Sequence, residues 1–158
     1  MEKKNVYWGI FLIALATLTW QVLLTRIFSA TMYYHFVFMS ISLAMLGFGC
    51  SGVLAILFAR FFSYERCDRH LSLFSCLFAV ALVLAVIVYL RVAVPARISL
   101  IAFTALLKIF IFIFIPYLFS GLTVTLAIKH HARHVTRLYC SDLVGAGLGC
   151  VVVIALLF

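Results

Sequence analysis

Five stretches of this chain, most of them close to twenty residues long, are apolar on every side. A helix needs ~20 apolar residues to cross the hydrocarbon core of a bilayer. Strands of a membrane barrel alternate polar and apolar residues, and these stretches do not alternate. Because a spanning segment must pair its own backbone polar groups, stretches of this kind are helices. The spans are expected at 6–24, 36–59, 71–90, 98–128 and 143–158.

The composition points to the same solvent. Apolar and aromatic residues make up 68% of the 158 residues, and charged residues make up 10%. A small soluble globule has too little interior to hide that much apolar surface, and it normally carries about 25% charged residues. We therefore predict an all-α, polytopic integral membrane bundle of about five transmembrane helices. It forms a single domain over residues 1–158 and is surrounded by membrane lipids.

The formal charge of +8 comes from Lys and Arg residues in the connections between spans. No basic face with interleaved aromatic residues is present, so a nucleic-acid partner is not expected. If five helices alternate in direction, one side of the membrane carries eight basic residues and the other carries three. The eight are Lys3, Lys4, Arg60, Arg66, Arg69, Lys129, Arg133 and Arg137, and the three are Arg26, Arg91 and Arg97. This asymmetry predicts a cytoplasmic N-terminus.

The ends of two spans carry further signals. Tyr7, Trp8 and Trp20 flank the first span, where amphipathic rings commonly anchor at the level of the lipid headgroups. The fifth span reaches Phe158 without a polar anchor after it. We therefore expect this chain to be the front part of a longer one, or to pack against a partner that supplies the next span.

A short polar group lies at the end of the first span. Gln21 and Thr25 are one helical turn apart and share a face, and Arg26 follows directly. Polar side chains are costly against lipid, so this face is expected to point into the bundle. In one interpretation Arg26 engages an anion or a carboxylate there. In the other, Arg26 extends to the headgroups while Gln21 ties two helices together.

Lys108 lies about ten residues into the fourth span, which indicates a position near the middle of the bilayer. An ammonium group at that depth costs ~3 kcal/mol or more. Asp142, the one acidic residue at the edge of a span, is the candidate counter-ion. With Arg26 and Gln21, these two residues define a candidate buried polar site. If they do not meet, Lys108 is neutral or lines a wet cavity. Asp142 is also the expected N-cap of the fifth span.

Small residues recur at helical spacing in two spans. The second span has Gly47, Ser51, Ala55 and Ala59, and the fifth has a GxxxG pair, Gly145 and Gly149. Such stripes let another helix approach closely, so we expect helix packing at these positions. The glycines of the fifth span do not form a nucleotide-binding loop, because that loop requires a preceding strand and a different spacing.

The fourth span is longer than a bilayer requires, so it must tilt, bend or emerge from the membrane. Pro116 lies in its second half and removes one helical hydrogen bond. A kink near residues 112–116 is therefore predicted.

Neither a cofactor nor a metal ion is expected. The five cysteines form no CxxC pair, and three of them lie inside apolar stretches, where cysteine behaves as a small hydrophobe. His130 and His134 have the spacing of a ligand pair on a helix. They lie among Lys129, Arg133 and Arg137, which repel a cation. A basic loop that contacts anionic lipid fits this stretch better.

Several motifs occur in the order found in one family. They lie in segments 23–29, 34–36, 41–52, 116–121 and 137–150. Through these segments the chain resembles the N-terminal membrane region of bacterial spermidine-synthase-like proteins. In that family a multi-span bundle precedes a cytoplasmic Rossmann-like aminopropyltransferase or methyltransferase domain. The resemblance implies a bacterial cytoplasmic membrane as the location.

Two departures from that family bear on function. The family usually has a carboxylate where this chain has Gln21, and these 158 residues contain no transferase domain. Groups arranged as a nucleophile, base or metal site are also lacking, so no enzymatic activity of its own is expected. The leading hypothesis is a non-catalytic membrane module. It would be an anchor for a fused transferase domain, or a small structural subunit that packs against other membrane subunits. The alternative hypothesis is a carrier or binding bundle for a small polar solute.

Overall fold

The computed structural model describes residues 3–31, 35–58, 67–92, 100–131 and 134–157. Within these residues the protein is all-α. The helices are α1 (Lys3–Thr31), α2 (His35–Leu57), α3 (Cys67–Arg91), α4 (Leu100–His130) and α5 (Val135–Leu157). Each of these five is long and apolar enough to cross a membrane. The predicted fold class is therefore confirmed: this is a five-helix membrane protein.

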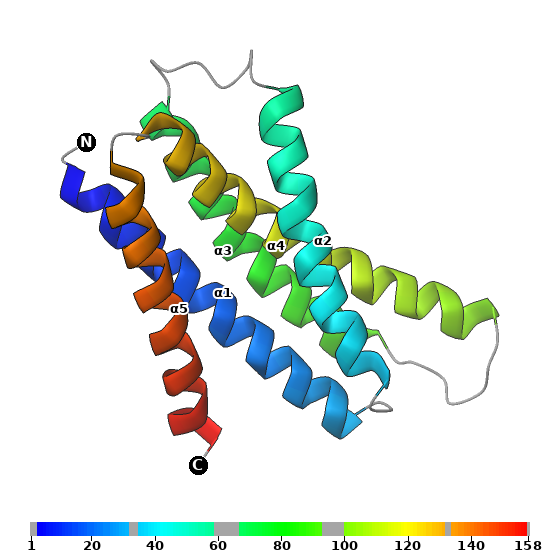
Figure 1. Ribbon diagram of the computed structural model, residues 1–158. Helices are drawn as coiled ribbons and strands as arrows, with labels where there is room; N and C mark the ends of the chain where they lie inside the picture. The colour runs from blue at the N-terminus through cyan, green and yellow to red at the C-terminus, as the bar shows by residue number, and fades with distance from the viewer. Residues whose placement is uncertain (1–2, 32–34, 59–66, 93–99, 132–133, 158) are drawn as a thin grey trace.

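Successive helices run in alternate directions (Figure 1). The end of the bundle that holds the starts of α1, α3 and α5 is called the proximal end. The end that holds the starts of α2 and α4 is called the distal end. As a result, α1 and α5 run the same way and pack against each other, while α4 packs against both α2 and α3.

The first helix is longer than the sequence pattern predicts, because its polar residues bond within it. It continues to Thr31 rather than ending at residue 24. The hydroxyl groups of Thr25 and Thr31 donate to the carbonyl oxygens of Val22 and Ile27, at 2.7 Å in each case. A hydroxyl satisfied by its own helix does not end that helix.

The fifth helix begins at Val135 instead of residue 143. The backbone N–H of His134 donates to the carbonyl of His131 at 2.8 Å, and this turn leads directly into α5. Asp142 therefore lies about two turns inside the helix. The expectation that Asp142 is the N-cap of this span is wrong, because the backbone N–H groups at its position are already in the helical ladder.

Two clusters of buried side chains form the core. The main core cluster draws on α1 to α4 and comprises Trp20, Leu24, Phe28, Ala44, Ala85, Ile109, Ile113 and Tyr117. A smaller cluster joins the proximal parts of α1, α3, α4 and α5 and comprises Val6, Ile10, Leu71, Leu126, Ala127 and Leu138. Trp20 is only 8% exposed, so its expected place at the headgroups is wrong. It faces other helices because its indole packs on α1's inward side with Leu24 and Phe28.

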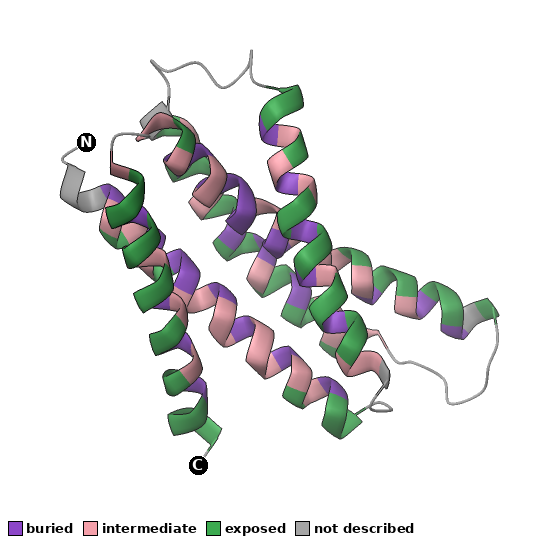
Figure 2. Ribbon diagram, in the orientation of Figure 1, coloured by how far each residue is buried: buried purple, intermediate pink, exposed green. Residues whose placement is uncertain are grey.

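The outer surface of the bundle is apolar, as contact with lipid requires. Exposed residues cover most of α5 and the outer sides of α2 and α3 (Figure 2). Large hydrophobic side chains account for many of them, including Phe38, Ile56, Val83 and Ile154. The axis of α4 changes direction near its middle, where Pro116 lies, and the start of this helix extends away from the other helices (Figure 1).

Candidate polar site and helix-packing seams

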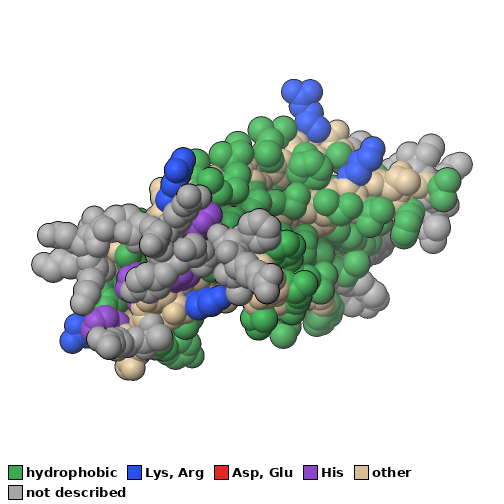
Figure 3. Space-filling view, turned by 90° about the horizontal axis from the view of Figure 1, so that it is seen from above, with side chains coloured by type: hydrophobic (Ala, Val, Ile, Leu, Met, Phe, Trp, Pro, Cys, Tyr) green, Lys and Arg blue, Asp and Glu red, His purple; other side chains and the backbone are tan. Residues whose placement is uncertain are grey.

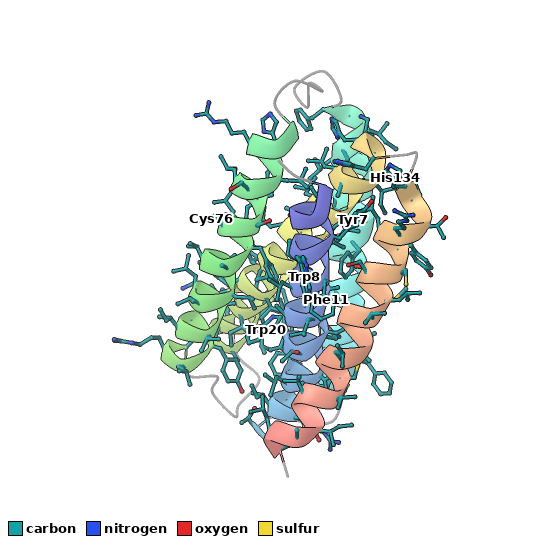
Figure 4. The ribbon with its side chains drawn as sticks, turned by 90° about the vertical axis from the view of Figure 1, so that its left-hand side faces the viewer. Tyr7, Trp8, Phe11, Trp20, Cys76 and His134 are labelled. Carbon is teal, nitrogen blue, oxygen red and sulfur yellow. The ribbon has the colours of Figure 1, made fainter. Side chains whose placement is uncertain are left out.

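A seam of small residues on α5 lies directly on the backbone of α1. The Ser141 hydroxyl donates to the carbonyl oxygen of Tyr7 at 2.8 Å. One turn further on, a Cβ atom added at Gly145 would overlap the carbonyl of Phe11. Figure 4 shows α1 and α5 side by side, with Tyr7 and Phe11 on α1.

The seam continues one more turn. A Cβ added at Gly149 would come within 2.6 Å of the carbonyl of Leu15. The Thr19 hydroxyl donates back to the carbonyl of Gly149 at 3.3 Å. Both glycines of the GxxxG pair therefore lie where the two backbones approach each other too closely for a side chain.

The small residues of α2 face α4. A Cβ added at Gly47 would come within 2.5 Å of the Cβ of Tyr117, and one added at Gly121 would overlap the side chain of Ser51. Ala55 is buried on the same face of α2. Ala59, the last residue of the predicted stripe, lies outside the described residues. This second seam holds α2 and α4 at close range.

The residues of the candidate buried polar site are not gathered in one place. Gln21 is half-buried, and its Oε1 atom is buried without a hydrogen-bond partner. Arg26 is exposed on the distal part of α1. Lys108 is exposed on the first half of α4, whereas Asp142 is half-buried near the proximal end of α5. These two helices touch little, and Figure 1 shows those parts of them on opposite sides of the bundle.

Buried polar groups that the sequence pattern did not single out lie in the helix contacts. The hydroxyls of Thr17 in α1 and Ser120 in α4 are 2.8 Å apart. Thr17 donates its one hydrogen to the carbonyl of Ile13 at 2.6 Å, so Ser120 is the donor in the pair. Both residues lie inside uniformly apolar stretches, and only their hydroxyl groups mark them in the sequence.

Further buried groups have no hydrogen-bond partner among the described residues. In the helix contacts they include Trp20 Nε1, Ser40 Oγ and Tyr117 Oη, and at the end of α4 they include His131 Nδ1. Tyr117 and Ser40 are both fully buried. Trp20 and Tyr117 belong to the main core cluster, and Ser40 lies on the α2 face that packs against that cluster, one turn before Ala44. A polar group without a partner is costly in a membrane interior.

Histidine and basic side chains gather at the proximal end, where Figure 3 looks down on them. The Nδ1–H of His130 donates to the carbonyl of Leu126 at 2.9 Å, which ties that ring to its own helix. Among the described residues, no three His, Cys, Asp or Glu side chains are placed to hold a metal ion. Cys76 and Cys140 are free and exposed.

No family model, curated protein or solved structure matches this chain. The resemblance to the membrane region of spermidine-synthase-like proteins stays a prediction.

Proposed function

We propose that this protein is a non-catalytic membrane module that packs into a larger membrane protein or complex. The observation that carries the proposal is the difference between the two faces of α2. Gly47 faces α4, where a Cβ atom has no room. Gly49 and Gly52 have open space instead, with nothing within 4 Å of an added Cβ. The inward face of α2 therefore carries one glycine, and the outward face carries two that are three residues apart.

An outward glycine surface favours a further helix over lipid alone. Helices in membranes associate where small residues let two backbones approach and increase van der Waals contact. Gly49 lies between the exposed side chains of Met45 and Val53, one turn away on either side. The α2 backbone at Gly49 is therefore uncovered between two large apolar side chains. A helix of another subunit, or of a second part of the same polypeptide, fits such a surface.

The experiment compares outward glycines on α2 with an outward glycine on α5. The assembly is examined by native electrophoresis after gentle extraction from the membrane. Substitutions Gly49→Leu and Gly52→Leu cover the outward glycine pair of α2, where an added Cβ meets nothing within 4 Å. Gly147→Leu on α5 is the matched control, because Gly147 has the same open space but no second glycine three or four residues away on its face. The proposal predicts that the α2 substitutions release the chain from its assembly and that the control does not. If the α2 substitutions and the α5 control left the chain in its assembly to the same extent, the proposal would be contradicted.

One version of this proposal rests on the family resemblance. In this version the bundle is a membrane anchor that holds a fused transferase domain at a bacterial cytoplasmic membrane. The excess of Lys and Arg on the proximal side supports a cytoplasmic N-terminus. Proteolysis of sealed inverted and right-side-out vesicles tests this orientation. Cleavage near Lys3 in inverted vesicles only would support it, and cleavage in right-side-out vesicles only would overturn it.

The buried polar atoms favour a second candidate function, a binding or carrier bundle for a small polar solute. Trp20 Nε1, Gln21 Oε1 and Tyr117 Oη are all buried without a partner, so a guest with hydrogen-bonding groups would satisfy them. In this version Lys108 and Arg26 lie at the distal entrance. Uptake into proteoliposomes is the test. Both Tyr117→Phe and Lys108→Met should lower uptake if the carrier hypothesis holds, and unchanged uptake would reject it.

A further inference from the structure

Three basic residues from three helices lie at the distal end with exposed side chains. Arg26 is near the end of α1, Arg91 is the last residue of α3, and Lys108 is in the first half of α4. The sequence count alone separates them, because it assigns Lys108 to the middle of a span. Ring contacts and one hydrogen bond between helices show that the three residues lie at the same end of the bundle.

The contacts of α1 with α3 bring Arg26 and Arg91 to one level. Phe28 and Tyr89 are in ring contact at 5.9 Å, and each lies two residues from one of these arginines. The hydroxyl groups of Thr31 and Tyr89 are 2.6 Å apart, so the ends of the two helices coincide. Both arginines therefore lie near the distal boundary of the bundle.

Lys108 lies at the same end. Phe110, two residues after it, is in ring contact at 6.3 Å with Phe36, the second residue of α2. The start of α2 is at the distal end. Lys129 lies in the last turn of α4, at the proximal end, so the two exposed lysines of this helix lie toward opposite ends of the bundle.

In the part of the distal end that the structure describes, the charged side chains are basic and none is Asp or Glu. The chain has no Asp or Glu between residues 3 and 64, or between 69 and 141. Of its four acidic residues, Asp68 and Asp142 belong to the proximal parts of α3 and α5. Glu2 and Glu65 precede α1 and α3 in the sequence and lie outside the described residues. Among the residues that the structure describes, the distal end therefore offers no Asp or Glu side chain to Arg26, Arg91 and Lys108.

We propose that Arg26, Arg91 and Lys108 bind the phosphate groups of anionic phospholipids in the leaflet at the distal end. Ile111 and Leu107 beside Lys108 are exposed to the acyl chains, so the lysine stem lies along lipid while its ammonium group extends to the headgroups. Zwitterionic lipids offer a phosphate whose charge is offset by their own ammonium group. Anionic lipids leave that charge for the protein, which strengthens each contact.

Fluorescence quenching of the full chain in bilayers tests the proposal. A reporter variant carries Trp8→Phe and Ile111→Trp, so that its exposed indole lies one turn from Lys108. The quenchers are phosphatidylglycerol and phosphatidylcholine with brominated acyl chains. We expect brominated phosphatidylglycerol to quench this reporter about twofold more strongly than brominated phosphatidylcholine. Equal quenching by the two lipids would overturn the proposal.

Two triple variants separate the distal residues from basic charge in general. Replacing Arg26, Arg91 and Lys108 by Gln should abolish the preference for phosphatidylglycerol at the reporter. Replacing Arg69, Lys129 and Arg137 by Gln is the matched control, since these three are also exposed and lie at the proximal end. The preference should survive in the control. Survival in the distal triple variant, or loss in the proximal one, would contradict the proposal.

A salt titration covers the case in which the distal triple variant does not fold by circular dichroism. The reporter variant with its distal charges intact should lose its preference for phosphatidylglycerol as ionic strength rises to about 0.5 M, because contacts at the membrane surface are screened. Lys108→Arg keeps the charge and should keep the preference. A preference that is independent of salt would reject binding through these charges. None of these outcomes depends on whether the protein is a packing module.

Discussion

The Ser141 hydroxyl in α5 donates a hydrogen bond to the main-chain carbonyl of Tyr7 in α1 at 2.8 Å, across 134 residues of sequence. The same offset recurs one and two turns later, where Gly145 meets Phe11 and Gly149 meets Leu15. Because the two helices run in the same direction, one register is kept over two turns. Three small residues of α5, each one turn from the next, lie on three carbonyl groups of α1 with the same spacing. The attachment of α5 to the bundle depends on this register, so it is sensitive to single methyl groups.

Two alanine substitutions in α5 should have opposite effects. Gly145→Ala places a Cβ atom against the carbonyl of Phe11 and should lower the free energy of unfolding by about 1–3 kcal/mol. Gly147→Ala adds a Cβ in open space and should be neutral or stabilise by up to ~1 kcal/mol through helix propensity. Unfolding by titration with a denaturing detergent measures both. Equal effects would mean that α5 does not pack on α1 through this face.

Removal of the hydroxyl at position 141 should weaken the α1–α5 contact. Ser141→Ala is expected to cost about 0.6 kcal/mol, the usual value for an interhelical hydrogen bond in a membrane protein. Ser42→Ala is the control, because that hydroxyl donates to Phe38 within its own helix at 3.0 Å. The same detergent titration applies. A control that lost as much stability as Ser141→Ala would argue against an interhelical contribution.

The α2–α4 seam should allow compensation between two positions. Gly121→Ala overlaps the side chain of Ser51 and is expected to destabilise by about 1–3 kcal/mol. Adding Ser51→Gly removes the overlapping atoms and should restore most of that loss. A double-mutant cycle measures the coupling. If the two substitutions were additive, the seam would not bring these residues together.

The unpartnered hydroxyl of Tyr117 distinguishes a dry core from a binding site. If nothing occupies the interior, Tyr117→Phe removes a buried polar group without a partner and should stabilise the bundle by about 1 kcal/mol. If a polar guest is held there, the substitution should instead lower stability in native membranes. Thermal unfolding before and after extraction separates these outcomes. Stabilisation in both states is the result that the packing-module account predicts.

The five spans were predictable because lipid leaves a chain few solutions. Uniformly apolar stretches of this length must be helices, and that argument needs no knowledge of tertiary contacts. The ends of the helices were less predictable. Thr25 and Thr31 are polar residues that indicated a connection, yet both satisfy their hydroxyls within α1. The prediction from polarity therefore placed the end of the first span at residue 24, whereas α1 continues to Thr31.

The positions of single polar residues could not be obtained from sequence periodicity. Counting residues from the predicted start of a span placed Lys108 near mid-depth. The count cannot account for the length and bend of α4, and the contact between Phe110 and Phe36 shows Lys108 near the distal end. Trp20 looked like an interfacial anchor, yet it lies in the main core cluster. The depth of a side chain and the direction in which it points depend on contacts between helices, and the sequence of a single span does not contain them.

The mass of the assembly that contains this chain, measured after gentle extraction from its native membrane, tests the central claim most directly. A packing module should arrive within a larger assembly, as part of a longer polypeptide or with other subunits. Gly49→Leu should then release it or destabilise that assembly. A chain that arrives alone at its own mass of 17.8 kDa with a small polar molecule retained would contradict the account and favour a carrier.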